Sequence, residues 1–144
     1  MLNILHHYIG TKILNRIEPE ISHAIALCYL RLLNQFVKKR KIGNPMLKTK
    51  ICGMEVPSPI GLAAGFDKNA EVFNATLSLG FGFVEVGTIT PDPQFGNPKP
   101  RLFRLPEEEA LINRMGFNNK GMLYVSKIAE KPKLGIVGVN IGAN

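Results

Sequence analysis

Lys68 is the residue of this sequence best placed to do chemistry, because it lies at the end of the stretch "IGLAAGFDKN", residues 60–69. The stretch begins as an apolar run, passes through small residues and ends in an Asp-Lys pair, which is typical of a buried strand that opens into a loop. Small residues let a ligand approach the backbone, and a lysine there offers a cation to a carboxylate or a phosphate. The stretch therefore predicts an anion-binding position at the end of a strand.

Two further predicted strands end in small or polar residues. Gly87 and Thr88 follow one apolar segment, and Asn140 closes another, just before Ile141 and Gly142. Since the carboxyl ends of parallel strands meet at one edge of a sheet, we expect the three ends to form one binding site. Thr88 and Asn140 would offer hydrogen bonds to a planar ligand. The alternative is that the glycines only form turns and that Lys68 is only solvated.

The elements that must position these residues alternate between strand and helix after Asn44. The expected elements are strands near residues 60–64, 81–88 and 134–142 and helices over residues 69–80 and 121–131, with a proline-rich excursion over residues 91–112. This order is typical of the first part of a parallel α/β fold.

The first 44 residues differ from the rest and predict two short amphipathic helices. Apolar residues recur at helical spacing in both: Leu2, Leu5, Ile9, Ile13 and Ile17 in the first, and Ile21, Ala24, Ile25, Cys28, Leu32 and Phe36 in the second. Pro19 starts the second helix, and Gly43 and Pro45 end the segment after the basic cluster Lys38–Lys41. Such a pair is typical of a membrane-surface element, and equally of an ordinary helical hairpin packed on the main domain.

Composition narrows the class of protein. With 144 residues and 45% hydrophobic content, the chain can form one globular domain. The net charge of +7 comes from the first 50 residues, but these basic residues are not interleaved with stacking aromatics and Trp is absent, so a nucleic-acid partner is disfavoured. Cys28 and Cys52 show no metal-ligand spacing and are interpreted as core residues. No uncharged apolar run reaches the roughly 20 residues of a spanning helix.

Three longer strings carry a more specific signal. They are "GLAAGFDKN", "GFGFVEVGTITPDPQFGNPKPRLFRLPEEEALINRMGFNNKG" and "GVNIGAN", in this order. Together they resemble the class 2, quinone-dependent dihydroorotate dehydrogenases, strongly over residues 57–144 and by architecture over residues 1–50. The resemblance implies an α/β fold, the N-terminal part of a (β/α)8 TIM barrel, preceded by an amphipathic helix pair that binds the membrane and forms the quinone entrance. It also implies an enzyme of pyrimidine (UMP) biosynthesis that oxidises dihydroorotate to orotate with FMN and passes the electrons to a membrane quinone.

The resemblance assigns roles residue by residue. The implied FMN-binding residues are Ala64, Gly65, Phe66, Asp67, Lys68, Thr88 and Asn140. The implied orotate-binding residues are Asn113, Arg114, Met115, Gly116 and Phe117, together with Lys68, which would face both the flavin and the substrate carboxylate. Arg104 and His23 are the implied polar pair of the quinone site, although His23 reads equally well as an ordinary helix-face histidine. No metal site is expected.

The resemblance also divides the chain and exposes departures from the family. Residues 1–44 would form a membrane-associating helical hairpin, and residues 45–144 an incomplete flavin-binding barrel with about three of the eight strands that a closed barrel requires. The serine base of the family and the loops that hold the FMN phosphate belong to later strands, so no residue here is assigned as catalytic base. Ala143 stands where the family commonly has a basic residue.

The sequence therefore predicts a truncated chain that is inactive alone, and a second polypeptide that completes the barrel is one way to restore activity. A non-catalytic remnant that still binds membrane is the alternative. A related flavin barrel with a soluble electron acceptor is disfavoured, because it would not need the N-terminal helices. The expected location is peripheral, on the cytoplasmic face of the bacterial inner membrane, or else on the mitochondrial inner membrane.

Overall fold

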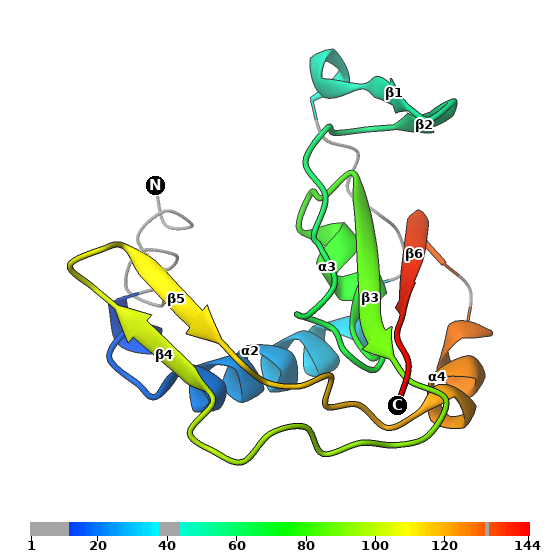
Figure 1. The fold of residues 1–144 in the computed structure, drawn as a ribbon. Coiled ribbons are helices and arrows are strands. Elements are labelled where there is room, and N and C mark those ends of the chain that lie inside the picture. Colours follow the sequence, from blue (N-terminus) through cyan, green and yellow to red (C-terminus); the bar gives the residue numbers. More distant parts are fainter. Residues whose placement is uncertain (1–11, 38–43, 132) are drawn as a thin grey trace.

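The computed structural model describes residues 12–37, 44–131 and 133–144, and its centre is a parallel strand pair (Figure 1). Strand β3 (Phe83–Ile89) and strand β6 (Ile136–Ile141) run side by side in the register Phe83↔Ile136 to Val86↔Val139, with an irregularity before Ile89↔Ile141. Both strands and their parallel pairing confirm the prediction from the sequence. On the other side of β3, Leu62 forms a parallel bridge with Val84.

The prediction of a strand over residues 60–64 is wrong, because the segment forms a single bridge, at Leu62, and no regular strand. The segment is joined to β3 by backbone bonds, from Leu62 N to Phe83 O at 3.1 Å and from Glu85 N to Leu62 O at 2.8 Å. Its other edge has no strand partner in the described part of the chain, and Ile60 is exposed. A segment that can build a ladder on one side only does not form a regular strand here.

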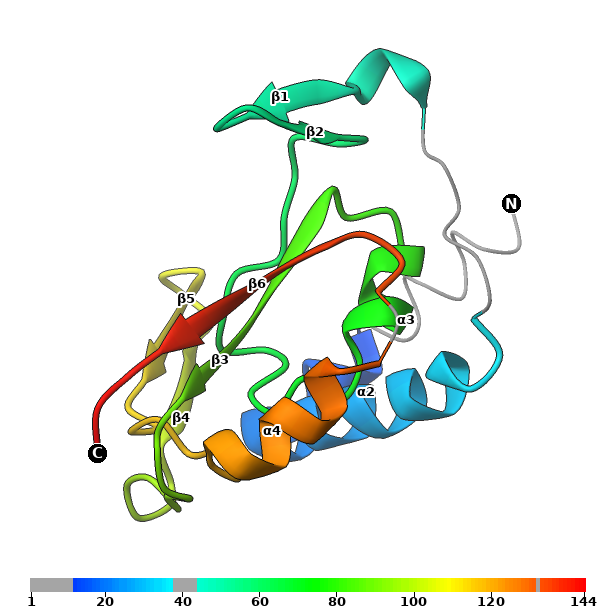
Figure 2. The same cartoon turned by 90° about the vertical axis from the view of Figure 1, so that its right-hand side faces the viewer.

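Two helices cover one face of the parallel pair. Helix α3 (Phe73–Ser78) and helix α4 (Met122–Ala129) lie on the same side of β3 and β6 (Figure 2). The core between them is apolar and consists of Ala70, Phe73, Leu77, Val84, Val86, Ile89 and Val125. Helix α4 confirms the prediction closely. Helix α3 begins later than predicted, because the buried Asp67 carboxylate accepts bonds from the Glu71 and Val72 amides and holds the chain before Phe73 in a turn.

Two antiparallel hairpins were not expected from the sequence. Strands β1 (Thr49–Ile51) and β2 (Met54–Val56) follow a 3-10 turn, η1 (Pro45–Leu47), and stand apart at the amino end of β3 (Figure 1). Strands β4 (Leu102–Leu105) and β5 (Ala110–Asn113) form within the region predicted to be an excursion. Strands of three or four residues next to prolines are too short to show a clear period of two.

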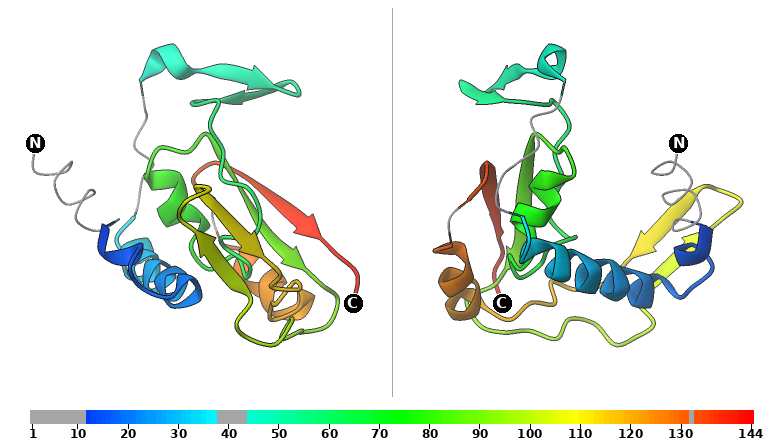
Figure 3. Two further views of the ribbon diagram at one scale, coloured as in Figure 1. Left: turned by 60° about the vertical axis from the view of Figure 1, so that its left-hand side comes forward. Right: turned by 180° about the vertical axis from the view of Figure 1, so that it is seen from behind.

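Helix α2 (Pro19–Asn34) packs its less apolar side on the rest of the chain. Glu18 caps the helix by accepting a 2.8 Å bond from the Ile21 amide, and Leu30 packs with Val72 and Ala75. The helix begins beside the β4–β5 hairpin and runs towards α3 (Figure 3). The apolar face predicted from the sequence points outward, with Ile21, Ile25, Leu32 and Phe36 exposed, and Tyr29 is exposed beside them.

The prediction that the cysteines are core residues is wrong. Cys28 lies on the outward face of α2 and Cys52 at the turn of the β1–β2 hairpin, and both thiols are free and exposed. Of the first predicted helix, residues 12–14 are helical and Ile17 lies in the bend that follows, whereas Leu2, Leu5 and Ile9 lie outside the described residues, as does the basic cluster Lys38–Lys41. Among the described residues, no helix is both long enough and apolar enough to cross a membrane.

Candidate functional site

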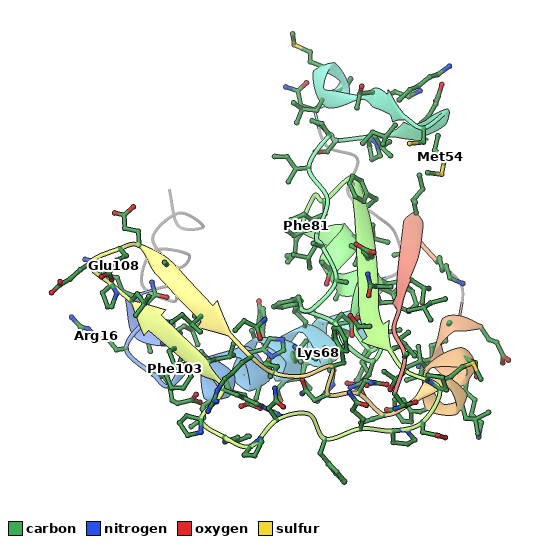
Figure 4. All side chains as sticks on the ribbon, in the orientation of Figure 1. Arg16, Met54, Lys68, Phe81, Phe103 and Glu108 are labelled. Carbon is green, nitrogen blue, oxygen red and sulfur yellow. The ribbon has the colours of Figure 1, made fainter. Side chains whose placement is uncertain are left out.

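A cleft of about 380 Å³ lies at the carboxyl end of the parallel segments. Its lining combines residues that the sequence placed in separate groups, and adds Asn97: Ala64, Gly65, Lys68, Thr88, Asn97, Asn113, Arg114, Met115, Gly116 and Phe117. Lys68 lies near the lower end of β3, between this strand and α2 (Figure 4). We call this space the lysine cleft.

The loop before Lys68 is shaped by Asp67, which is 2% exposed. Besides the two amide bonds to its side chain, its carbonyl accepts a bond from the Gly87 amide at 3.0 Å. Burial raises the pKa of the Asp67 carboxyl. The Asp67 side chain therefore faces the protein and not the cleft, and a flavin contact from this residue would have to use its backbone.

Lys68 is half-buried and turns its ammonium back over the loop, where it donates a hydrogen bond to the Gly65 carbonyl. Burial lowers the pKa of Lys68, Glu20 partly opposes that shift, and Arg101 adds to it. No carboxylate forms an ion pair with Lys68 in the described part of the chain. A ligand carboxylate in the cleft would supply the missing counter-charge.

Thr88 and Asn140 meet across the parallel pair. The Thr88 hydroxyl donates a 2.8 Å bond to Asn140 Oδ1, and Asn140 Nδ2 lies 3.4 Å from a Glu85 carboxylate oxygen. Gly87 precedes Thr88 with φ of +111°, and a Cβ on it would lie 2.5 Å from the Asn140 carbonyl oxygen. Only glycine allows this approach. Thr88 lines the lysine cleft, whereas Asn140 stands behind it and orients the hydroxyl.

The segment Asn113–Phe117 forms a tight turn on the opposite wall. The Asn113 side chain accepts a 3.0 Å bond from the Met115 amide, and Gly116 has φ of +73°. Asn97 supports the turn from the proline-rich loop, because its Nδ2 donates to the Arg114 carbonyl at 2.7 Å. The turn is thus held by backbone and amide bonds, which leaves Asn113 and Arg114 at the rim of the cleft.

A second cleft of about 390 Å³ adjoins the first and shares Ala64, Gly65, Lys68, Asn113 and Met115 with it. The added lining comes from α2 and the β4–β5 hairpin, with His23 and Arg104 as its polar members. We call it the helix cleft. The two residues predicted to form a polar pair therefore line one space.

His23 connects α2 to the loop before Lys68. Its Nε2 lies 2.7 Å from the Phe66 carbonyl oxygen, and its ring meets the Phe66 ring edge-on with centroids 5.2 Å apart. Burial lowers the pKa of His23, and the positive charge of Lys68 adds to that effect. A neutral imidazole that donates its Nε2–H to the carbonyl accounts for this geometry.

Arg104 reaches from β4 to the start of α2. It donates to the Ile17 carbonyl and, at 3.2 Å, to the Leu14 carbonyl, so it satisfies carbonyl groups where the first helical turn ends. No group of His, Cys, Asp and Glu residues within the described ranges could hold a metal ion.

The comparisons with known proteins decide the family. The family model described as dihydroorotate dehydrogenase matches residues 46–144. The chain belongs to the dihydroorotate dehydrogenase family.

Relatives of this family resemble nearly the whole chain. It is 51% identical over 138 residues to a dihydroorotate dehydrogenase (quinone) of Mesorhizobium japonicum, covering 94% of this chain and 38% of the relative. It is 50% identical over 141 residues to one of Marinomonas sp., covering 96% of this chain and 41% of the relative. A ligand-free DHODH structure from Eimeria tenella superposes with a TM-score of 0.75 at 41% identity, over 88% of this chain and 37% of that one. The chain thus spans about two fifths of the length of the curated relatives it matches.

Some residues that shape the clefts were missed by the sequence reasoning. Asn97 lines the lysine cleft, and Arg101 is buried behind it. Both lie in the stretch interpreted as a proline-rich excursion, where no apolar periodicity marks them. The Asn-Pro pair at 97–98 was the available signal, because it favours a turn.

Proposed function

We propose that this chain forms the N-terminal part of a dihydroorotate dehydrogenase that oxidises dihydroorotate to orotate with FMN and reduces a membrane quinone. The observation that carries the proposal is the meeting of Lys68 with the Asn113–Phe117 turn in one cleft, beside a second cleft that holds His23 and Arg104. The names of the relatives, dihydroorotate dehydrogenase (quinone), agree with this function.

The substrate would lie in the lysine cleft. Dihydroorotate carries a carboxylate, and the two cations that line this cleft, Lys68 and Arg114, form no ion pair within the described residues. The Lys68 ammonium is half-buried at the cleft, whereas the exposed Arg114 guanidinium donates to the Pro100 carbonyl, so Lys68 is the cation proposed to meet the carboxylate. The Asn113 side chain and the amides of the turn offer hydrogen bonds to the carbonyl and ring N–H groups of the substrate. These contacts bind and orient the ring, while a base from outside the chain is needed for the proton that leaves carbon.

The cleft suits a planar cofactor. Gly65 has φ of +109°, lines both clefts, and has no heavy atom within 4 Å of the position a Cβ would take. A flat ring can therefore lie against the backbone of Ala64 and Gly65, with Lys68 and Thr88 at its polar edge. Bound FMN would accept the hydride of the substrate and pass electrons on. No residue here is assigned to the FMN phosphate.

The quinone would enter through the helix cleft, where His23 and Arg104 are the polar groups. The outward apolar face of α2 would lie on the membrane, so residues 1–44 would act as a membrane-associating hairpin and residues 45–144 as the incomplete barrel. The protein would then be peripheral, on the cytoplasmic face of a bacterial inner membrane, with the mitochondrial inner membrane as the alternative.

The experiment uses the part of the Marinomonas relative that follows the matched segment. This remainder is produced alone, mixed with the 144-residue chain, and fused to it, and each sample is tested for flavin absorbance and for dihydroorotate-dependent reduction of a quinone analogue. We expect activity in the fusion and none in either part alone. Activity in the mixture would assign the completing role to a second polypeptide. A folded fusion that keeps FMN and does not oxidise dihydroorotate would refute the proposal.

A membrane-binding, non-catalytic chain is the second candidate, favoured by the outward apolar face of α2, which serves binding without any catalysis. It predicts that the chain binds vesicles while the fusion stays inactive.

A further inference from the structure

Arg101 is the most deeply buried cation of the described residues, and its ion-pair partner comes from α2. Its guanidinium binds the Glu20 carboxylate twice, from Nε at 3.2 Å and from Nη2 at 2.7 Å. The two side chains are 8% and 15% exposed. Lys99 adds a weaker contact to Glu20 at 3.3 Å, and its own side chain is mostly exposed.

The rest of the Arg101 guanidinium holds the proline-rich loop. Nη1 donates to the Phe95 carbonyl at 2.6 Å and to the Asn97 carbonyl at 3.0 Å. Nε and Nη2 are directed to Glu20, so a single side chain joins the first turn of α2 to the loop at residues 95–97.

That loop in turn carries the Asn113–Phe117 turn. The Asn97 amide donates to the Met115 carbonyl at 2.9 Å, and the Asn97 side chain to the Arg114 carbonyl at 2.7 Å. The Arg114 amide donates to the Arg101 carbonyl at 3.0 Å. A continuous series of bonds therefore leads from Glu20 to the wall of the lysine cleft.

We propose that the Glu20–Arg101 ion pair is a positioning device through which helix α2 sets the geometry of the Asn113–Phe117 turn and its affinity for an anionic ligand. The pair touches no ligand itself, because Glu20 lines neither cleft and Arg101 lies behind Asn97. The positioning of the turn follows from the bonds alone, whereas the ligand, dihydroorotate or orotate, rests on the proposed function.

The charges around the pair make Glu20 the position to change. Arg101 holds the pKa of Glu20 below its usual range, with Lys99 contributing, so Glu20 is ionised near neutral pH. Glu20→Gln keeps the size of the side chain and leaves the bonds from Arg101 to Phe95 and Asn97 possible, but it removes the charge. Hydrogen bonds to charged groups stabilise a structure more than neutral ones do. Without the charge-assisted bonds between Arg101 and Glu20, the open state of the turn should be populated about ten-fold more or higher.

The first measurement is amide hydrogen exchange in the 144-residue chain. In Glu20→Gln, exchange at residues 113–117 should rise about ten-fold relative to exchange in β3 and β6, and Glu20→Asp should restore part of the protection. Glu55→Gln is the matched control, because Glu55 pairs with Lys48 on the exposed β1–β2 hairpin, far from the turn. Unchanged exchange at 113–117, or an equal rise in every element, would overturn the positioning role.

The second measurement uses the fusion with the Marinomonas remainder. Glu20→Gln should raise KM for dihydroorotate several-fold with little change in KM for the quinone analogue, whereas a loss of stability alone would lower kcat and leave both KM values in place. Equal changes in the two KM values would overturn the proposal. If the unmutated fusion has no activity, the proposed function fails, while the exchange measurement still decides the positioning role.

Discussion

Replacing Lys68 by methionine tests the lysine cleft most directly. Methionine keeps the length of the side chain and removes the ammonium, whose one hydrogen bond within the described residues goes to the Gly65 carbonyl. A charge-assisted bond to a ligand carboxylate contributes about 1.5–3 kcal/mol, which corresponds to roughly 10- to 150-fold in affinity. Burial lowers the pKa of Lys68, so part of its charge is already disfavoured, and we expect the lower half of that range.

The assay is kcat/KM for dihydroorotate in the fusion, together with orotate affinity by calorimetry. Lys127→Met is the matched control, because Lys127 lies exposed on α4 outside both clefts. A loss of kcat/KM could come from weaker ligand binding or from a less stable fold, and the free energy of unfolding separates the two. Removing a half-buried charge should not lower that free energy. A change in kcat/KM below about two-fold, the size of an ordinary exposed pair, would show that Lys68 is only solvated.

The lowered pKa of Lys68 adds a pH dependence with a defined sign. Between that lowered pKa and the ordinary value of 10.5, the folded chain binds fewer protons at Lys68 than the unfolded chain, so its contribution to the free energy of unfolding rises with pH. Orotate affinity should change in the opposite direction, falling as Lys68 loses its proton. Lys68→Met should abolish both slopes, which titration calorimetry and denaturant unfolding at several alkaline pH values would measure.

Three further perturbations follow from the same structure. Ile25→Glu places a charge on the outward face of α2 and should weaken binding of the chain to lipid vesicles by about ten-fold in a sedimentation assay, whereas Thr49→Glu on the β1–β2 hairpin should not. Arg101 depresses the pKa of Glu20, so this pair stabilises the fold above the unfolded pKa of about 4.5 and loses that effect as pH falls through the depressed value. Glu20→Gln should therefore reduce the pH dependence of stability in acid, measured as unfolding followed by circular dichroism. Gly87→Ala should cost about 1–3 kcal/mol in the free energy of unfolding, measured with denaturant, because its Cβ would meet the Asn140 carbonyl oxygen.

The parallel core could be predicted from the sequence because its periodic segments extend over many residues. The segment at β3 places Val84 and Val86 on one face over seven residues, and α4 repeats its apolar positions over eight, so the period is visible without tertiary contacts. The segment around Leu62 failed because a regular strand needs partners, and apolar content cannot report whether a second edge is filled. The β4–β5 hairpin failed because four-residue strands leave almost no period to read.

The clefts could be predicted only in part, for a related reason. Thr88 lies at the carboxyl end of β3, and Lys68 follows the segment that runs parallel to β3 at Leu62, so their meeting is a consequence of parallel order. Asn97 and Arg101 act through backbone carbonyls of a loop and through Glu20, which lies 81 residues earlier in the chain. No spacing rule connects positions that meet only because a helix packs across a hairpin.

In helix α2 the spacing of apolar residues identifies the apolar face but not what that face contacts. The spacing of Ile21, Ile25 and Leu32 correctly marks one apolar face, but a helix with such a face suits a core and a membrane equally. The structure shows which face packs on the rest of the chain: Ser22 and Leu30 are buried, and His23 contacts the Phe66 carbonyl in the loop before Lys68. The less apolar face therefore supplies His23 to the helix cleft and Glu20 to the ion pair with Arg101, while the apolar face is exposed. Because the clefts share Lys68 and Asn113, a ligand that moved α2 on its inner side would alter the walls of both at once.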